Sequence, residues 1–180
     1  PTVRLAWKLD DNHKLSLFLN RRVDRPNEVD IRIFPKYDEP ELIKVGNPGL
    51  RPQFTTSTDL GYRMAWSGGS LYAAGYHRIV DATITRIATQ APGSPLLYNV
   101  FQNAGRSRIT GSELVWQQTV SPAVSISANA NLYRTSIGAF TVVNLYPVPV
   151  TYSAAKTSLT SGSLKVNANL RLPGAWETRV

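Results

Sequence analysis

Hydrophobic and polar residues alternate with a period of two along residues 3–10 and again along residues 15–20. Successive side chains of a β-strand point to opposite faces of its sheet, so each stretch predicts a strand with one apolar face. Asp11-Asn12 lies between them, and both residue types favour tight turns. We therefore expect the chain to open with a β-hairpin.

The same alternation predicts five further strands and the beginning of an eighth. In the expected strand 70–86, two sets of apolar positions compete for the apolar face, so the sequence does not decide which residues of this strand lie on it. No stretch of the sequence predicts a helix. The expected strands are 54–66, 70–86, 104–119, 124–133, 164–172 and, in part, 175–180.

Short and long connections alternate between the expected strands. Short turns are expected at 10–12, 67–69, 120–122 and 173–174, and long loops at 21–53, 87–103 and 135–157. In an up-and-down meander, consecutive connections lie at opposite ends of the sheet, so all the short turns share one end. The sequence thus predicts an all-β, antiparallel meander of about seven to eight strands, with the asymmetry typical of outer-membrane β-barrels.

Composition narrows the range of functions. The chain carries 20 Lys and Arg against 12 Asp and Glu, a net charge of +8, but these residues are scattered rather than in runs, which argues against nucleic acid as a partner. The chain has no cysteine, which excludes a disulfide scaffold, thiol catalysis and cysteine metal sites. No apolar run approaches the roughly 20 residues of a transmembrane helix, whereas a membrane barrel crosses with alternating strands of about 10 residues.

The four tryptophans all lie close to an expected short turn. Tryptophan is enriched where a membrane meets water, because its ring is apolar while its N–H needs a polar partner. We therefore predict an interfacial aromatic girdle at the short-turn end; the alternative is a set of core tryptophans in a soluble sandwich. The residues of the predicted girdle are Trp7, Trp66, Trp116 and Trp176.

Three motifs in residues 1–120 resemble a known family. They are Arg22-Val23-Asp24-Arg25-Pro26, Gly46-Asn47-Pro48-Gly49-Leu50-Arg51-Pro52-Gln53 and Asp59-Leu60-Gly61-Tyr62, followed by Asn103, Gly105, Gly111 and Glu113. Together they resemble the C-terminal barrel region of the TonB-dependent receptors of bacterial outer membranes. Gln53 is a departure, since the family usually has Glu there. The marker turn of this resemblance consists of Gly46, Asn47, Pro48, Leu50 and Pro52.

The resemblance implies a function and a set of partners. Such receptors carry out energised uptake of a scarce solute such as a siderophore, a vitamin or an oligosaccharide. Residues 1–180 would be a β-barrel segment of a larger receptor, with the plug domain and the remaining strands absent. The expected partners are outer-membrane lipid, the small solute and, through the missing plug region, the TonB energy-coupling system; the expected location is the bacterial outer membrane.

The sequence shows no pattern of catalytic or metal-binding residues. His13 and His77 fall at a turn and in a strand, and the carboxylates of the first loop (Asp24, Asp30, Asp38, Glu39, Glu41) lack the spacing of a calcium loop. We expect no enzyme activity, no metal and no cofactor.

Arginine grips carboxylate and phosphate groups bidentately, so arginines of the polar faces and loops are candidates to contact the solute. The same residues could instead form loop salt bridges or face lumen water. The alternative to a membrane barrel is a soluble or surface β-sandwich that binds a ligand through its long loops. The candidate solute-contacting residues are Arg21, Arg22, Arg25, Arg63, Tyr98, Arg106 and Arg108.

Overall fold

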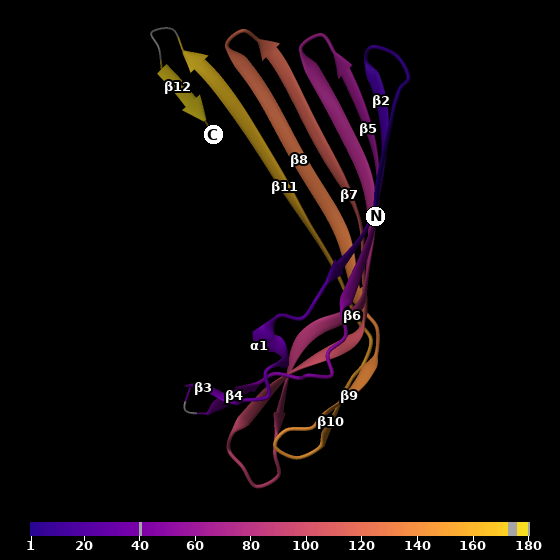
Figure 1. Ribbon diagram of the computed structural model, residues 1–180. Helices are drawn as coiled ribbons and strands as arrows, with labels where there is room; N and C mark the ends of the chain where they lie inside the picture. Colours follow the sequence, from indigo (N-terminus) through magenta and orange to yellow (C-terminus); the bar gives the residue numbers. More distant parts are fainter. Residues whose placement is uncertain (40, 173–175, 180) are drawn as a thin grey trace.

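The computed structural model describes residues 1–39, 41–172 and 176–179, apart from the side chains of 38, 39, 172 and 176–179. Within these residues, eight strands pair in chain order into one antiparallel wall (Figure 1). The predicted up-and-down meander is therefore confirmed, and the alternative of a two-sheet sandwich is wrong for the wall. The wall strands are β1 (Thr2–Lys8), β2 (His13–Asp24), β5 (Gln53–Trp66), β6 (Gly69–Gln90), β7 (Leu97–Ser121), β8 (Val124–Ile137), β11 (Thr157–Leu172) and β12 (Trp176–Arg179).

The long connections gather at one end of the wall and the short turns at the other (Figure 1). Two of the long connections contain secondary structure that the alternation did not predict. One reason why the alternation missed these elements is that each is only one turn or a few residues long, which is too short to show a clear period. The elements are α1 (Glu28–Ile31), β3 (Lys36–Glu39), β4 (Leu42–Val45), β9 (Phe140–Asn144) and β10 (Val150–Ala154).

Two predictions for the connections are wrong. The long loop expected at 87–103 is a hairpin, because β6 continues to Gln90 and pairs with β7 from Leu97 onward. The breaker Pro92-Gly93-Ser94-Pro95 suggested a long loop, yet it lies in the turn of this hairpin, and the backbone on both sides of the turn is paired in the ladder. The first connection contains a helical turn where none was expected; Asn27 accepts a hydrogen bond from the Asp30 N–H, and the Asp30 carboxylate accepts one from the Asn27 N–H, which forms a capping box.

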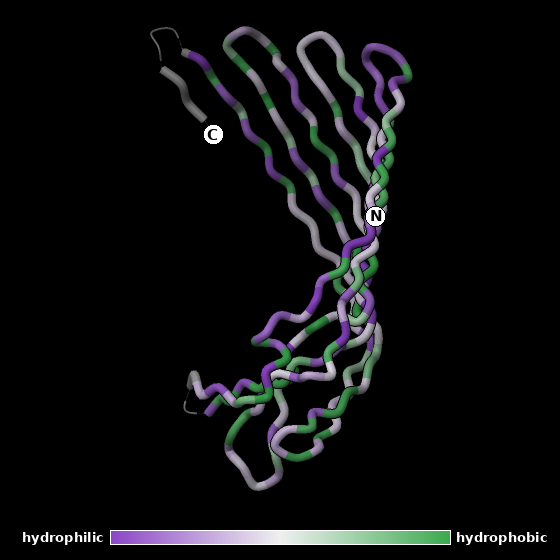
Figure 2. The backbone as a smooth tube through the Cα atoms, viewed as in Figure 1, coloured by the Kyte–Doolittle hydropathy of each residue, from purple (hydrophilic) through white to green (hydrophobic). Residues whose placement is uncertain are grey.

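The pairing register sorts the wall into two faces of opposite polarity. Directly opposed residues share a face, and one such row runs Trp7, Leu15, Tyr62, Ala73, Leu114, Ala130, Leu164. The adjacent row on the other side runs Lys8, Lys14, Arg63, Tyr72, Val115, Asn129, Lys165. We name these sides the apolar face and the polar face; their alternation appears as green and purple along β8 and β11 in Figure 2.

The pairing register also shows which residues of β6 lie on the apolar face, a question that the sequence left open. In β6 the odd-numbered residues from 69 to 79 lie on the apolar face, with Leu71 opposite Trp116 and Ala73 opposite Leu114. Large side chains of this face are uncovered: Leu60 is 52% exposed and Leu164 is 72% exposed. A contiguous apolar surface of this kind does not face water in a stable soluble protein.

A tyrosine of β6 lies flat against the polar face over a glycine of β7. Tyr76 is paired with Gly111, and the Tyr76 hydroxyl donates a hydrogen bond to Asn131 Oδ1 at 3.0 Å. A Cβ on Gly111 would lie 2.5 Å from the Tyr76 hydroxyl oxygen. The missing side chain of Gly111 therefore makes the space that the phenol ring fills, and the ring ties three strands together.

The β6–β7 hairpin bends where it leaves the wall. Ala82 and Gly105 both have positive φ, 55° and 51°, and they interrupt the ladder between the pairs Asp81–Arg106 and Thr83–Ala104. Beyond this bend the hairpin continues among the long connections. The parallel strand β4 pairs with its β7 side, from Leu42 opposite Leu97 to Val45 opposite Val100.

The long connections form a folded unit with its own core, which we name the loop cap (residues 25–39, 41–52, 83–104 and 138–156). Every described hydrophobic side chain that is buried belongs to it. This is expected, because a single wall sheet has no second layer to pack against, whereas the connections pack on one another. The buried apolar residues are Ile43, Val45, Ile87, Ala91, Tyr98, Val100 and Ala104.

One asparagine is completely buried at the centre of this cap. Asn144, at the end of β9, is 0% exposed. Its Nδ2 donates to the Ile87 carbonyl and to Thr89 Oγ1, both at 3.0 Å, and its Oδ1 accepts from Gln102 Nε2 at 2.8 Å. These bonds attach the third connection to both strands of the β6–β7 hairpin.

We predict that Gly111→Ala destabilises the folded protein by about 1–3 kcal/mol, because the new methyl group overlaps the Tyr76 ring and must displace it. Gly75→Ala is the matched control, since a Cβ there meets nothing within 4 Å. The measurement is the urea midpoint in detergent micelles. Equal midpoints for the two variants would contradict the packing of Tyr76 on Gly111.

We predict that Asn144→Ala opens the loop cap while leaving the wall intact. Loss of its three hydrogen bonds leaves buried partners unsatisfied, which costs about 1–3 kcal/mol and should raise cap amide exchange roughly 5- to 150-fold. Hydrogen exchange read by mass spectrometry measures both regions at once. Thr141→Ala on the same hairpin is the control, since its hydroxyl bond to Ser153 is exposed. Unchanged cap exchange in Asn144→Ala would refute the role of this residue.

Candidate functional site

The marker turn that follows β4 is bound on both sides within the loop cap. The Asn47 N–H donates to the Asp30 carbonyl at 2.7 Å, and Asn47 Nδ2 donates to the Phe101 carbonyl at 2.9 Å. Gly46 lies so close to the C-terminal end of α1 that a Cβ there would overlap the carbonyl oxygen of the C-cap residue Arg32. The turn therefore joins the first connection to the β6–β7 hairpin, which fixes the walls of the space beside it.

A second tie holds the chain between this turn and β5. Asn103 Oδ1 accepts from the Arg51 N–H at 2.8 Å, and Asn103 Nδ2 donates to the Arg51 and Ala82 carbonyls, both at 2.9 Å. The Gln53 side-chain oxygen accepts from the Ile84 N–H at 2.9 Å. Gln53 therefore keeps a structural role in this chain where the resembling family usually has Glu.

An apolar cleft of about 450 Å³ opens beside the marker turn. Its walls come from the first connection, the β6–β7 hairpin and the third connection, and the polar residues among its lining are Asn47, Gln102 and Tyr146. Leu145 on its wall is 71% exposed. Concave, mostly apolar sites with a few fixed polar groups are the usual form of a small-molecule site. The lining residues are Ile33, Val45, Gly46, Asn47, Pro48, Gly49, Val100, Gln102, Val143, Leu145 and Tyr146.

A smaller basic pocket adjoins the cleft and shares Val45 and Gly46 with it. This pocket has a volume of about 90 Å³, and the residues that line it include four cationic ones, Arg32, Lys36, Lys44 and Arg86, together with Val29, Phe34 and Phe101. The Arg86 guanidinium carbon lies 4.6 Å from the centre of the Phe101 ring, within the range of a cation–π contact. The two hollows together place an apolar surface next to the arginines Arg32 and Arg86.

Tyr146 on the cleft wall is held in its neutral form. Burial raises the pKa of its phenol, and the nearby Tyr37 and Tyr98 phenols raise it further. Its ring meets Tyr98 edge to face, with centroids 5.8 Å apart. Tyr146 therefore contributes a neutral phenol, packed on Tyr98, to the lining of the cleft.

Four of the predicted solute-contacting arginines lie at separate places. Arg21 is on the apolar face, 5.0 Å from the centre of the Phe54 ring, and Arg22 forms a salt bridge with Asp24 at 3.0 Å. Arg25 is exposed just beyond β2, and Arg63 is exposed on the polar face near the short turns. The structure does not bring these residues together.

The other three predicted residues lie near the base of the cap and within it. Arg106 and Arg108 are exposed on the apolar face of β7, and Arg106 forms a salt bridge with Asp81. Tyr98 is 8% exposed and belongs to the cap core. Of the predicted residues, none is among those that line the cleft or the basic pocket.

Sequence reasoning missed the lining residues because they come from three connections that it treated as loops. Arg32, Arg86 and Tyr146 have no periodic signal that relates one to another. The only usable signal was the marker turn, whose Gly46 and Asn47 do line the cleft.

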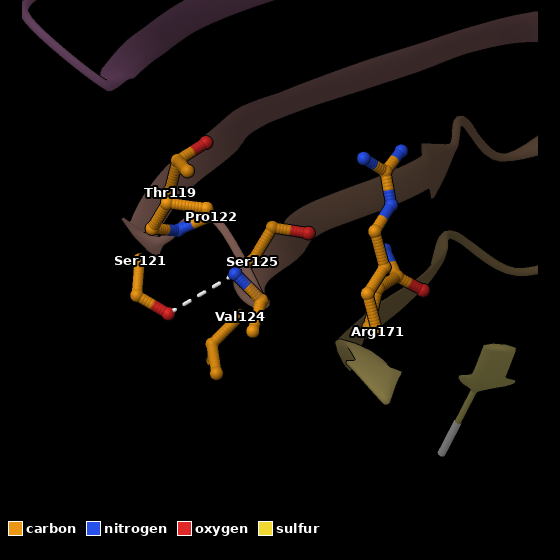
Figure 3. Close-up of a pocket in the computed structure, with 8 residues that line it drawn as sticks. Thr119, Ser121, Pro122, Val124, Ser125 and Arg171 are labelled. Atoms are coloured by element: carbon orange, nitrogen blue, oxygen red, sulfur yellow. Dashed lines mark hydrogen bonds between the residues drawn. The ribbon is translucent and has the colours of Figure 1, made fainter. Parts of the chain in front are cut away.

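A groove at the opposite end of the wall has a different character. It has a volume of about 330 Å³ and lies at the turn between β7 and β8 (Figure 3). Its polar groups serve the turn: Ser121 Oγ accepts from the Ala123 N–H at 3.2 Å, and the Ala123 carbonyl accepts from the Arg171 N–H at 2.8 Å. The Arg171 guanidinium extends away from Ser121 (Figure 3), so the groove shows no convergent set of binding groups.

The two histidines form hydrogen bonds with different partners within the wall. His13 Nδ1 and the Tyr62 hydroxyl share a hydrogen bond of 2.5 Å, and His77 Nδ1 and Thr110 Oγ1 share one of 2.7 Å. No group of three or more His, Cys, Asp or Glu residues suited to a metal ion occurs in the part of the chain that the structure describes. No helix among the described residues has the length and apolar character to cross a membrane.

Three of the four tryptophans are described with their side chains. Trp7, Trp66 and Trp116 occupy apolar-face positions near the short turns, and Trp66 Nε1 donates to Gln118 Oε1 at 2.8 Å. Trp176 lies in β12, outside the described side chains. The aromatic girdle stays a prediction.

Solved outer-membrane receptors share this fold. The chain is similar to the siderophore receptor PirA from Pseudomonas aeruginosa, with a TM-score of 0.66 and 14% identity over 99% of this chain and 37% of that chain. It is similar to the ferric enterobactin receptor PfeA from Pseudomonas aeruginosa (TM-score 0.60, 12% identity, 97% of this chain, 33% of that chain). It is also similar to the copper transporter OprC (TM-score 0.56, 14% identity, 96% of this chain, 31% of that chain). The chain thus spans about a third of the length of each.

No curated protein sequence matches the chain. The model of the outer membrane protein beta-barrel family matches residues 1–180. Together with the shared fold, this match confirms the resemblance to outer-membrane receptor barrels and the predicted location. The chain therefore belongs to the outer membrane protein beta-barrel family, and its strands form part of a barrel wall in the bacterial outer membrane.

Proposed function

We propose that this chain is a wall-and-loop segment of a TonB-dependent receptor that takes up a scarce small solute with energy supplied across the periplasm. Its strands separate lipid on the apolar face from the lumen on the polar face, and its long connections face outward from the cell. The observation that carries the proposal is the apolar cleft with its adjoining basic pocket, built into a loop cap that has its own core.

The proposal extends to the rest of the barrel. Within the described residues, β1 and β12 have a wall neighbour on one side only. A backbone that crosses hydrocarbon must have all its polar groups paired, which requires a closed sheet. We propose that further strands and the plug domain belong to the same protein, and that the plug carries the coupling to TonB.

The two hollows favour an amphiphilic anionic solute. The lining of the cleft contains no charged residue, so it suits an apolar or aromatic surface, while the basic pocket suits a carboxylate or phenolate group at the other end of the solute. A ferric siderophore combines these features, and a neutral oligosaccharide does not. The receptors PirA and PfeA, which share the fold, are named for siderophores.

We predict that the intact receptor binds ferric enterobactin more tightly than cyanocobalamin or maltohexaose, measured by equilibrium binding with labelled probes. Arg86→Gln should weaken ferric enterobactin binding about tenfold or more, because a contact to a charged group is lost. Tyr146→Ala should weaken it by a smaller factor. Thr141→Ala, in the cap but outside both hollows, should bind as the parent does.

A receptor that prefers a neutral probe, or an Arg86→Gln variant that binds like the parent, would contradict the anionic solute. Energy coupling is tested separately in cells. Removal of the proton gradient should stop uptake of the bound solute while surface binding persists. Uptake that continues without the gradient would contradict a TonB-dependent mechanism.

A further inference from the structure

Positively charged side chains occupy one lateral half of the polar face. In the wall, the polar-face positions of β7 and β8, all of them described, hold no Lys or Arg. Beyond this neutral stretch, β11 carries Lys165 and Arg171. The other cations of this face lie on β1, β2, β5 and β6, which we name the basic half. They are Arg4, Lys8, Lys14, Arg22, Arg63 and Arg78.

Near the short turns, cations of the basic half stand directly opposite one another in one row. Lys14 is paired with Lys8 on one side and with Arg63 on the other. Like charges directly opposite each other are unfavourable on a sheet. Lys8 Nζ donates to Asp11 Oδ1 at 2.6 Å, which neutralises its charge. Lys14 and Arg63 are exposed and have no salt bridge or side-chain hydrogen bond among the described residues.

An aromatic ring follows these cations in the same row. Tyr72 is paired with Arg63. A Cβ on Gly61 would lie 2.8 Å from the Tyr72 hydroxyl oxygen and 2.9 Å from a carbon of its ring, so the half-buried ring extends along the wall over this glycine. Aromatic rings pack on other ring systems, and Arg binds carboxylate groups. The row therefore combines a ring with two cations that lack an anionic partner.

Two further arginines lie on the basic half between this row and the loop cap. The Arg4 guanidinium carbon is 5.0 Å from the centre of the Phe18 ring, and that of Arg78 is 5.2 Å from the centre of the Tyr76 ring. Both distances are within the range of a cation–π contact. Cations held beside aromatic rings thus extend along the polar face from the cap toward the short turns.

Acidic residues are few on this path. Asp24 forms a salt bridge with Arg22, which leaves Asp59 as the other acidic residue at a polar-face position of the basic half. In the neutral stretch, Glu113 of β7 is exposed on the same face. A surface with an excess of one charge raises the local concentration of ions of the opposite sign. The basic half is therefore the favoured side for an anion, and the neutral stretch is not.

We propose that Lys14, Arg63 and Tyr72 form an exit site for the anionic solute at the short-turn end of the lumen, reached along the basic half of the wall. This inference rests on the proposed function, which makes the polar face the lumen wall and the solute anionic. The exit site repeats the combination of the cap, an apolar or aromatic surface beside cations. A carboxylate or phenolate at this site removes the repulsion between Lys14 and Arg63. Since the site lies away from the cap, it acts on passage and release rather than on capture.

The test uses the intact receptor in cells, with ferric enterobactin as the probe. Surface binding is measured without the proton gradient, and the initial uptake rate at saturating probe is measured with it. The variant K14Q/R63Q should bind the probe like the parent but take it up at least about fivefold more slowly, because contacts between cations and a charged group are lost. The charge-retaining variant K14R/R63K should take up the probe at close to the parental rate.

The matched control is K165Q/R171Q, which removes the same charge from polar-face positions of β11, on the other side of the neutral stretch. It should bind and take up the probe like the parent. If the parent takes up the probe and K14Q/R63Q does so at the same rate, the exit site is wrong and the proposed function stands. A parent that fails to bind the probe would overturn both.

The urea midpoint in detergent micelles distinguishes an exit site from a resting contact with another part of the receptor. In the protein without solute, K14Q/R63Q should have the midpoint of the parent or a higher one, because unfavourable contacts between like charges are removed. A lower midpoint, or failure of this variant to assemble, would mean that the two cations are already neutralised at rest, for example by the plug. Either result would overturn the exit site.

Discussion

A wall that faces hydrocarbon must satisfy its backbone hydrogen bonds within the sheet, because lipid offers no partner for an N–H or C=O group. The other features of this chain depend on that constraint. Continuous antiparallel pairing fixes the register, and the register decides which side chain of each strand meets lipid. Trp7, Leu15 and Tyr62 share the apolar face for this reason, while Lys8, Lys14 and Arg63 share the polar one.

The same constraint explains where the molecule keeps its core. A single wall has no opposing layer, so its packing is local, as where the Tyr76 ring covers Gly111. The connections are free of the membrane and can pack on one another. They build a core around the fully buried Asn144, with a bend at Ala82 and Gly105 between core and wall. The walls of the binding cleft are therefore fixed by contacts among the connections and do not depend on the packing of the strands in lipid.

Much of the wall could be predicted from the sequence because its physical basis is a period of two, which short stretches already show. Residues 124–133 and 164–172 alternate strictly, and both lie in strands of the structure. The β6–β7 hairpin beyond Asp81 could not be predicted in the same way. Its faces meet the other connections rather than lipid and water, so Thr89, Gln102 and Asn144 are polar yet buried.

The candidate site was less accessible to sequence reasoning for a related reason. The predicted arginines were chosen by residue type, and the structure distributes them over the apolar face, the polar face and the loops. Arg32 and Arg86 line one pocket and Tyr146 lines the adjoining cleft, because Asn47 ties the first connection to the β6–β7 hairpin and Asn144 ties the third connection to the same hairpin. The two hollows therefore depend on tertiary contacts between residues that are far apart in the sequence. The marker turn itself was recognisable by resemblance, but its role as a tie was not.

The central claim is that one face of each wall strand meets lipid and the other meets the aqueous lumen. The chain contains no cysteine, so single cysteines can be introduced without background. The direct measurement places them in turn at Leu164, Lys165, Val166 and Asn167 of β11, attaches a fluorophore, and records quenching by brominated lipid and by a water-soluble quencher in reconstituted membranes. The account predicts lipid quenching at 164 and 166 and aqueous quenching at 165 and 167. Aqueous quenching at all four positions, in a protein that stays folded without lipid, would contradict it.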